Sequence, residues 1–184
     1  MNSEVISSRY AKALLDYATE AGSGSKVYSQ ALLLTHIMQE TPLLKDLILR
    51  HDEVTLVTKL ELLAAALGEP LADELVRFAG LVNKQRRMDK FQSMLLSYII
   101  RYRQANNIMV GSLVTAAPAE NLREKLEAMF SERTASDVHF ATAVDPQLIG
   151  GFVFELDGYR LDASVRTRLE KIRQCLVDDN NRIV

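Results

Sequence analysis

Apolar residues recur with the 3.6-residue period of amphipathic helices through the first half of the chain, up to about Gln104. Short segments rich in Gly, Pro or polar residues interrupt this period, and they divide the region into about six helices. The interruptions are residues 22–25, 41–42, 50–53, 68–70 and 83–87. We therefore expect an N-terminal six-helix bundle and a mainly α fold.

The pattern changes after Asn106. Two runs rich in β-branched residues, IMVGSLVTAAP and VHFATAVDP, flank one helical segment. That segment carries an apolar face formed by Leu122, Leu126, Met129 and Phe130. The pattern predicts a helical domain over residues 1–105 and a small α/β domain over residues 106–184.

Asp157-Gly158 predicts a two-residue β-hairpin, because a type I′ turn needs positive φ at both central positions. The turn fixes the register, with Leu156 opposite Tyr159, and puts four apolar residues on one face: Phe154, Leu156, Tyr159 and Leu161. We expect this face to be buried. Just before the hairpin, Gly150-Gly151 lets the chain bend or approach another backbone closely.

A C-terminal helix is expected to follow the hairpin, with Asp162 or Ser164 as its N-cap. Its apolar stripe, predicted to lie on the apolar face of the sheet, is formed by Val165, Leu169, Ile172 and Leu176. Arg166 opposes the helix dipole in the first turn, so either Asp162 compensates it or a partner contacts it. The glycines are not a phosphate-binding loop, since a hairpin separates them from the helix and no GxxxxGK[ST] motif is present.

Composition and charge exclude several classes of function. The 184 residues are 48% hydrophobic, enough for a substantial core, and the net charge of −2 gives no global field for nucleic acid or anionic lipid. No window approaches the ~20 apolar residues of a membrane span, and the N-terminus lacks a signal-peptide pattern. The single cysteine excludes an internal disulfide.

Catalytic and metal-binding patterns are missing from the sequence. His36, His51 and His139 are scattered without acidic or thiol neighbours at ligand spacing, and no GxSxG, HExxH, CxxC or dinucleotide motif occurs. We therefore predict no catalytic residues, no metal and no cofactor. An enzyme of unrecognised type would need a deep polar pocket with shifted titrating groups.

One basic cluster offers an alternative function. It is formed by Lys84, Arg86, Arg87 and Lys90. These residues suit either a polar loop before a helix or an RNA-binding adaptor that resembles bacterial antitermination factors. RNA binding would fall steeply with salt.

The first and fifth helices carry unusually wide apolar faces. On a helical wheel, the first covers roughly 200° and the fifth roughly 160°, where packing on one side needs about 100°. Such faces suit a groove that receives another helix, with anchors at i, i+3, i+4 and i+7. A central position within the bundle explains them equally well.

Two stretches resemble one protein family. RYAKALLDYA, residues 9–18, and IGGFVFELDGYRLDASVRTRLEKI, residues 149–172, resemble the opening helix and the C-terminal signature of the delta subunit of F-type ATP synthase. The mitochondrial counterpart of this family is the oligomycin-sensitivity-conferring protein. The layout of a helical bundle followed by a small α/β domain is similar over nearly the whole chain.

The resemblance implies a non-catalytic stator subunit of a proton-translocating ATP synthase, at the cytoplasmic face of a bacterial cell membrane. It implies that the groove between the first and fifth helices binds the N-terminal helix of an alpha subunit. The expected groove residues are Ile6, Tyr10, Ala13, Leu14, Tyr17, Leu75, Phe78, Ala79 and Val82.

The resemblance also implies that the C-terminal domain binds the ends of the b-type stalk subunits. Its signature residues, with a structural or stalk-binding role, are Gly150, Gly151, Gly158, Asp162, Ser164, Arg166 and Leu169. It implies no direct nucleotide or nucleic-acid binding, and contact with the membrane only through the complex.

Overall fold

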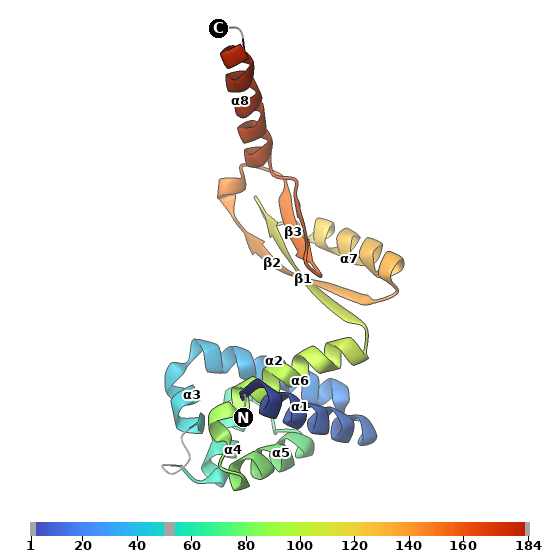
Figure 1. Ribbon diagram of the computed structural model, residues 1–184. Coiled ribbons are helices and arrows are strands. Elements are labelled where there is room, and N and C mark those ends of the chain that lie inside the picture. The colour runs from blue at the N-terminus through green and yellow to red at the C-terminus, as the bar shows by residue number, and fades with distance from the viewer. Residues whose placement is uncertain (1–2, 50–53, 183–184) are drawn as a thin grey trace. The chain divides into compact units, whose positions relative to one another are not determined.

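The computed structural model describes residues 3–49 and 54–182. These residues are mostly helical and include a four-stranded mixed sheet. The chain divides into two compact units, Met1–Asn106 and Asn107–Val184 (Figure 1). The predicted break at residues 50–53, with His51, lies outside the described residues.

The N-terminal unit consists of helices joined by short turns, as far as the chain is described (Figure 1). They are α1 (Ser3–Glu20), α2 (Gly24–Glu40), α3 (Pro42–Leu49), α4 (Leu56–Leu67), α5 (Asp73–Lys84), the 3₁₀ turn η1 (Met88–Lys90) and α6 (Phe91–Ala105). Their ends fall at the Gly, Pro and polar breaks of the sequence. Gly68, for example, ends α4 with a φ of 73°, a left-handed conformation that glycine adopts without a steric penalty.

Helix α6 packs against both α1 and α2 and supplies much of the core. Met94, Leu95 and Tyr98 on α6 are completely buried. The Tyr98 hydroxyl donates to the carbonyl oxygen of Gly24 at 3.3 Å, and burial raises the pKa of this phenol. These contacts tie the start of α2 to the middle of α6.

A buried glutamine fixes the entry into α5. The side chain of Gln30, on α2, donates to the carboxylate of Glu69 at 2.7 Å and to the carbonyl oxygen of Pro70 at 3.0 Å. Its amide oxygen accepts the backbone N–H of Ala72 at 2.8 Å. Because Ala72 immediately precedes α5 and has no side chain to cap it, Gln30 takes over part of the capping role.

The C-terminal unit contains β1 (Ile108–Thr115), α7 (Glu120–Thr134), β2 (Asp137–Val144), the 3₁₀ turn η2 (Pro146–Leu148), β3 (Phe152–Leu156), β4 (Tyr159–Asp162) and α8 (Val165–Arg182). The strand order is β2-β1-β3-β4. Strands β1 and β2 are parallel and joined through α7, whereas β3 pairs antiparallel with both β1 and β4. The core between α7 and the sheet is formed by Leu113, Leu126, Val138, Phe140, Phe154 and Leu156.

The predicted hairpin register is confirmed, since Leu156 pairs with Tyr159 across Asp157 and Gly158. Both turn residues have positive φ, 49° and 79°. The prediction that the whole apolar face is buried is wrong for β4, where Tyr159 is 79% exposed. The reason is that α7 lies against β2, at the opposite edge of the sheet from β4.

Helix α8 also departs from the prediction. Its apolar stripe was expected to cover the sheet, but α7 occupies that role, and Figure 1 shows α8 beyond the end of the sheet. The stripe is exposed instead, with Leu169 at 51% and Leu176 at 64%. Helix α8 contacts the turn η2 rather than the core.

Replacing Gln30 with leucine should lower the free energy of unfolding by about 1–3 kcal/mol, because the N–H of Ala72 and the carbonyl of Pro70 would lose their buried partner. Urea denaturation followed by circular dichroism measures the loss. The matched control is Gln39→Leu on the exposed side of the same helix, which should change stability by less than about 0.5 kcal/mol. Equal effects of the two variants would contradict the capping role of Gln30.

Candidate functional site

An apolar groove lies between α1 and α5 on the N-terminal unit. Its volume is about 260 Å³, and it is lined by Ala13, Leu14, Tyr17, Arg77, Phe78 and Leu81. Leu14 and Phe78 form its floor and are almost fully buried, whereas Leu81 is 47% exposed. A strip of this kind, with a buried floor and exposed apolar sides, suits the apolar face of a helix.

Two arginine–tyrosine pairs join the helices that form the groove. Arg77 on α5 donates to the Tyr17 hydroxyl at 2.6 Å, and Arg87, just beyond α5, donates to the Tyr10 hydroxyl at 3.0 Å. Each guanidinium also lies near the ring of the same tyrosine, at 6.0 Å and 5.6 Å from the centroid. Such cation–π contacts add to the hydrogen bonds and hold the tyrosine rings in place.

The groove residues expected from the sequence divide between the groove and the core. Those that line it are Ala13, Leu14, Tyr17 and Phe78. Tyr10 is partly buried and contacts Phe78 edge to face at 6.3 Å between ring centroids. The rest lie in the hydrophobic core: Ile6, Leu75, Ala79 and Val82.

Sequence reasoning missed Arg77 and Leu81 in the groove. The expected groove residues were all apolar or tyrosine and did not include Arg77, although a long arginine side chain can cover apolar surface with its stem. Leu81 stands four residues after Arg77, so the two share one row of α5. That row lies beside the apolar face of α5, and this position could have predicted from the sequence that both residues line the groove.

In the C-terminal unit, Gly150 and Gly151 permit a close approach between the start of β3 and the start of α8. A Cβ on Gly151 would collide with the carbonyl oxygen of Ala163, and its φ is 76°. The carbonyl oxygen of Gly150 accepts the N–H of Val165 at 2.9 Å. The paired glycines therefore pin the first residue of α8 to the segment that enters β3.

Asp162 and Ser164 cap the start of α8. The Ser164 hydroxyl accepts the N–H of Thr167 at 3.2 Å, and the Asp162 carboxylate accepts the N–H of Ser164 and the hydroxyl of Thr167, both at 2.9 Å. The hydrogen bonds from Ser164, with that from Thr167, lower the pKa of Asp162 to about 2. This carboxylate is thus held in its charged form by local donors.

Arg166 pairs with Glu170 one turn later, at 3.3 Å between Nε and Oε1. The expectation that Asp162 compensates Arg166 is therefore wrong, because that carboxylate is bound to Ser164 and Thr167. An i,i+4 pair on an exposed helix contributes only about 0.3–0.5 kcal/mol.

The stripe of α8 forms a second exposed apolar surface. It comprises Val165, Leu169, Ile172 and Leu176, which follow one another at spacings of four, three and four residues. Residues at these spacings share one side of a helix. Exposed apolar stripes of this length are typical of helices that pack on another chain.

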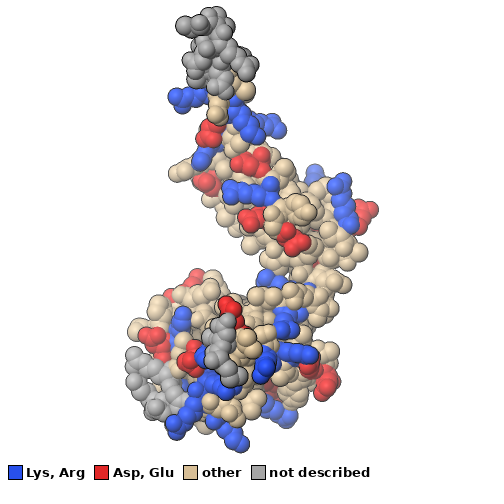
Figure 2. All heavy atoms as spheres, in the orientation of Figure 1, with Lys and Arg blue, Asp and Glu red and all other residues tan. Residues whose placement is uncertain are grey.

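Charged groups give little sign of another kind of site. Figure 2 shows basic and acidic side chains interspersed on the visible face of each unit, and Arg87 of the basic cluster is bonded to Tyr10. The expectation that the histidines lack acidic neighbours is wrong for two of them, since His36 pairs with Glu40 at 3.3 Å and His139 pairs with Asp137 at 3.1 Å. In residues 3–49 and 54–182, no group of three His, Cys, Asp or Glu side chains could hold a metal ion.

Comparison with known proteins identifies relatives over nearly the whole length. The family model described as ATP synthase delta (OSCP) subunit matches residues 6–176. The chain is 42% identical to the ATP synthase subunit delta of Phocaeicola vulgatus over 182 residues, covering 98% of each chain. It is 36% identical to the ATP synthase subunit delta of Bacteroides thetaiotaomicron over 184 residues, again with 98% coverage of both.

A solved structure shares the fold. It is a chain in the cryo-EM structure of the mitochondrial ATP synthase hexamer of Toxoplasma gondii, with a TM-score of 0.61 and 19% sequence identity. The match covers 93% of this chain and 97% of that one. None of these comparisons supports the alternative of an RNA-binding adaptor.

Gly151→Ala should destabilise the C-terminal unit by about 1–3 kcal/mol, because the new methyl group meets the carbonyl of Ala163 in a backbone conformation that disfavours side chains. Gly158→Ala is the matched control, since its φ of 79° is similar but no atom lies within 4 Å of the added Cβ. Thermal unfolding of both variants measures the difference. If Gly158→Ala costs as much as Gly151→Ala, the close approach is not what requires glycine.

The carboxyl group of Asp162 should titrate at a pH of about 2, below its ordinary value of 3.8. Because the folded-state pKa is depressed, its contribution to stability is present above pH 4 and is lost as the pH falls towards 2. Carboxyl carbon NMR against pH measures the midpoint, and Asp162→Ala should show a smaller loss of stability over the same pH range. A midpoint near 4 would contradict the capping arrangement.

Proposed function

Because the chain belongs to the ATP synthase delta (OSCP) family, it is a structural subunit of the peripheral-stalk stator of an F-type ATP synthase, and we propose that its two units bind different partners there. The N-terminal unit, acting as a six-helix bundle, receives the N-terminal helix of an alpha subunit. The C-terminal unit receives the ends of the b-type stalk subunits. The chain thereby links the catalytic hexamer to the membrane-anchored stalk.

The observation that carries this proposal is the groove between α1 and α5. Its sides present Ala13, Tyr17 and Leu81 around a floor of Leu14 and Phe78. An amphipathic helix can place anchors three and four residues apart along such a strip and bury them there. The Arg77–Tyr17 pair keeps one side of the strip in a fixed position for the incoming helix.

The same geometry suits the mechanical task of a stator. Rotation of the rotor would drag the catalytic hexamer along unless a link to the membrane resists it. A non-covalent link resists only if it dissociates slowly, and buried apolar contact meets this need better than exposed charge pairs, which salt screens. An apolar groove is therefore the appropriate surface for the alpha-subunit helix.

The stripe of α8 supports the second contact. Val165, Leu169, Ile172 and Leu176 present one apolar side to the surroundings, and a stalk helix could bury this side by packing alongside. The signature residues around the start of α8 then act as its support, since Gly150, Gly151, Asp162 and Ser164 fix where the helix begins. Arg166 and Leu169 lie on the exposed first turns, within reach of a partner.

We expect no catalytic step in this chain and a location at the cytoplasmic face of a bacterial membrane, held there through the complex. Within the described ranges, no helix is both long and apolar enough to cross a bilayer. Attachment through protein partners is consistent with the two apolar surfaces described above.

Ala13→Asp should weaken binding of a peptide from the N-terminus of a cognate alpha subunit on the order of 100-fold. Ala13 is exposed in the free chain, so the aspartate costs little there, but a bound helix would bury its charge without a partner, at about 3 kcal/mol or more. Isothermal titration calorimetry of the full chain against the peptide, at low and high salt, measures this. Binding by the unmodified chain should be largely salt-tolerant.

The control is Ala65→Asp on α4, which adds the same charge at an exposed alanine outside the groove. It should bind the peptide like the unmodified chain, and both variants should keep the helical circular dichroism spectrum. Absence of binding by the unmodified chain at micromolar concentrations would refute the alpha-subunit contact. Equal binding by Ala13→Asp would move the contact away from this groove.

A further inference from the structure

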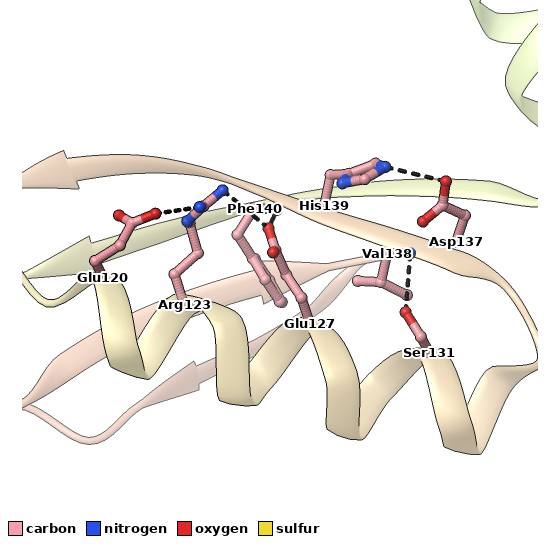
Figure 3. Close-up of polar contacts among 8 residues, drawn as sticks. All are labelled: Glu120, Arg123, Glu127, Ser131, Asp137, Val138, His139 and Phe140. Carbon is pink, nitrogen blue, oxygen red and sulfur yellow. Dashed lines mark hydrogen bonds and ion pairs between the residues drawn. The ribbon is translucent and has the colours of Figure 1, made fainter.

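Strand β2 lies at the edge of the sheet, and side chains of α7 cover only part of its outer side. The N–H of Val138 donates to the Ser131 hydroxyl at 3.1 Å, and the N–H of Phe140 donates to the Glu127 carboxylate at 2.8 Å (Figure 3). These two amides therefore point away from β1. Since backbone groups alternate along a strand, the amides of Thr142 and Val144 point outward as well.

The side chains of α7 that accept hydrogen bonds from the outer amides of β2 end at Glu127. One turn earlier on α7 the corresponding residue is Arg123. Its guanidinium is bonded to Glu120 and paired with Glu127 at 3.6 Å (Figure 3). A guanidinium only donates hydrogen bonds, so Arg123 cannot accept one from Thr142 as Ser131 and Glu127 do for their amides. Its own Nε is buried and finds no acceptor within the described part of the chain.

The outer backbone groups of Thr142 and Val144 consequently have no hydrogen-bond partner in the ranges that the structure describes. Both residues are exposed, and Val144 is 51% accessible. An unpaired strand edge is a template for another extended chain. Here the open edge is two outward-facing residues long, which limits pairing to a short segment.

A small cavity adjoins this open edge. It has a volume of about 130 Å³ and lies between the ends of β1 and β2 and the start of α7. Leu113 and Thr115 line it from β1, Thr142 and Val144 from β2, and Ala119 from the segment before α7. The lining is mainly apolar, so the cavity suits one aliphatic side chain.

The charged residues near the open end of β2 determine which extended segments would bind there favourably. Three carboxylates, Glu120, Glu124 and Glu127, lie near Arg123 and raise its pKa, the hydrogen bond to Glu120 most of all, and Lys125 is a second cation beside Glu120. The Glu120 side chain is 64% exposed at the mouth of the cavity. An excess of carboxylates over cations here favours a segment that carries lysine or arginine.

We propose that an extended segment of a b-type stalk chain adds to the open end of β2. It pairs with the outer backbone groups of Thr142 and Val144, inserts an aliphatic side chain into the cavity, and places a basic side chain beside Glu120. The inference rests on the proposed function, in which the C-terminal unit holds the stalk, and it adds a strand contact distinct from the helical contact on α8. Backbone pairing supplies affinity, and the cavity with Glu120 supplies selectivity.

The test uses the full chain and a synthetic peptide from the C-terminal end of the cognate b-type subunit. Residue-resolved amide exchange by NMR should show slower exchange of Thr142 and Val144 when the peptide is bound. Thr142→Pro removes the outward N–H at an edge position that tolerates proline, and it should weaken binding roughly tenfold. Thr142→Val keeps the N–H and nearly the same side-chain volume in the cavity, so any loss that it causes measures the share of the side chain, and Thr142→Pro should weaken binding well beyond it.

The outcomes separate the strand contact from the stalk function. In one outcome, the bound peptide slows amide exchange only in α8, and Thr142→Pro binds the peptide as tightly as the unmodified chain does. This result overturns the strand contact and leaves the proposed function standing. Absence of any peptide binding overturns the stalk contact itself and the strand contact with it. Protection of Thr142 that rises with protein concentration and needs no peptide indicates a second copy of the chain and also overturns the proposal. If the proline variant is unstable, the exchange rates of the Thr142 and Val144 amides in the unmodified chain, with and without the peptide, still test the strand contact.

Discussion

The structure of the N-terminal unit depends on how α1 and α5 divide their apolar faces between the core and the surface. Leu14 and Phe78 belong to both: each is almost fully buried, and each forms the floor of the groove. The outer layer of the core is therefore also the inner layer of the candidate binding site. Any change that shifts α5, including loss of the Gln30 contacts at its start, would alter the shape of the groove.

A different constraint organises the C-terminal unit, where the backbone at Gly150-Gly151 passes very close to the start of α8. The bond between the N–H of Val165 and the carbonyl of Gly150 fixes the first residue of that helix beside the entry to β3. Because α7 already covers the sheet, the apolar stripe of α8 is not part of the described core of this unit and is exposed. The helix is thus held at one end, where it contacts η2, while Leu169, Ile172 and Leu176 along its side remain exposed in the described structure.

The sequence was most informative where structure is decided locally. Helix ends followed glycine and polar breaks, and the Asp157-Gly158 turn determined the hairpin register because both positions need positive φ. It was least informative about which surfaces meet. The hydrophobic effect is not directional. The periodicity of α8 therefore predicted an apolar side, but it did not indicate that α7, and not α8, would cover the apolar face of the sheet. The same limit applies to Gln30, whose partners are about forty residues distant, and to Arg77, whose contribution to the groove comes from its aliphatic stem.

A stator link loaded at two ends behaves as contacts in series, so its lifetime is set by the contact that dissociates faster. Strengthening one end beyond the other gains nothing, and both surfaces must bury enough apolar area to dissociate slowly. The two units have separate cores, so if each binds one partner as proposed, losing one partner need not unfold the surface for the other. Exposed charge pairs would be weakened by salt at either end, whereas the groove and the α8 stripe are mainly apolar. Arg77 and Arg87 are hydrogen-bonded to tyrosines of their own unit. These bonds therefore stabilise the walls of the groove and are not exposed charge pairs.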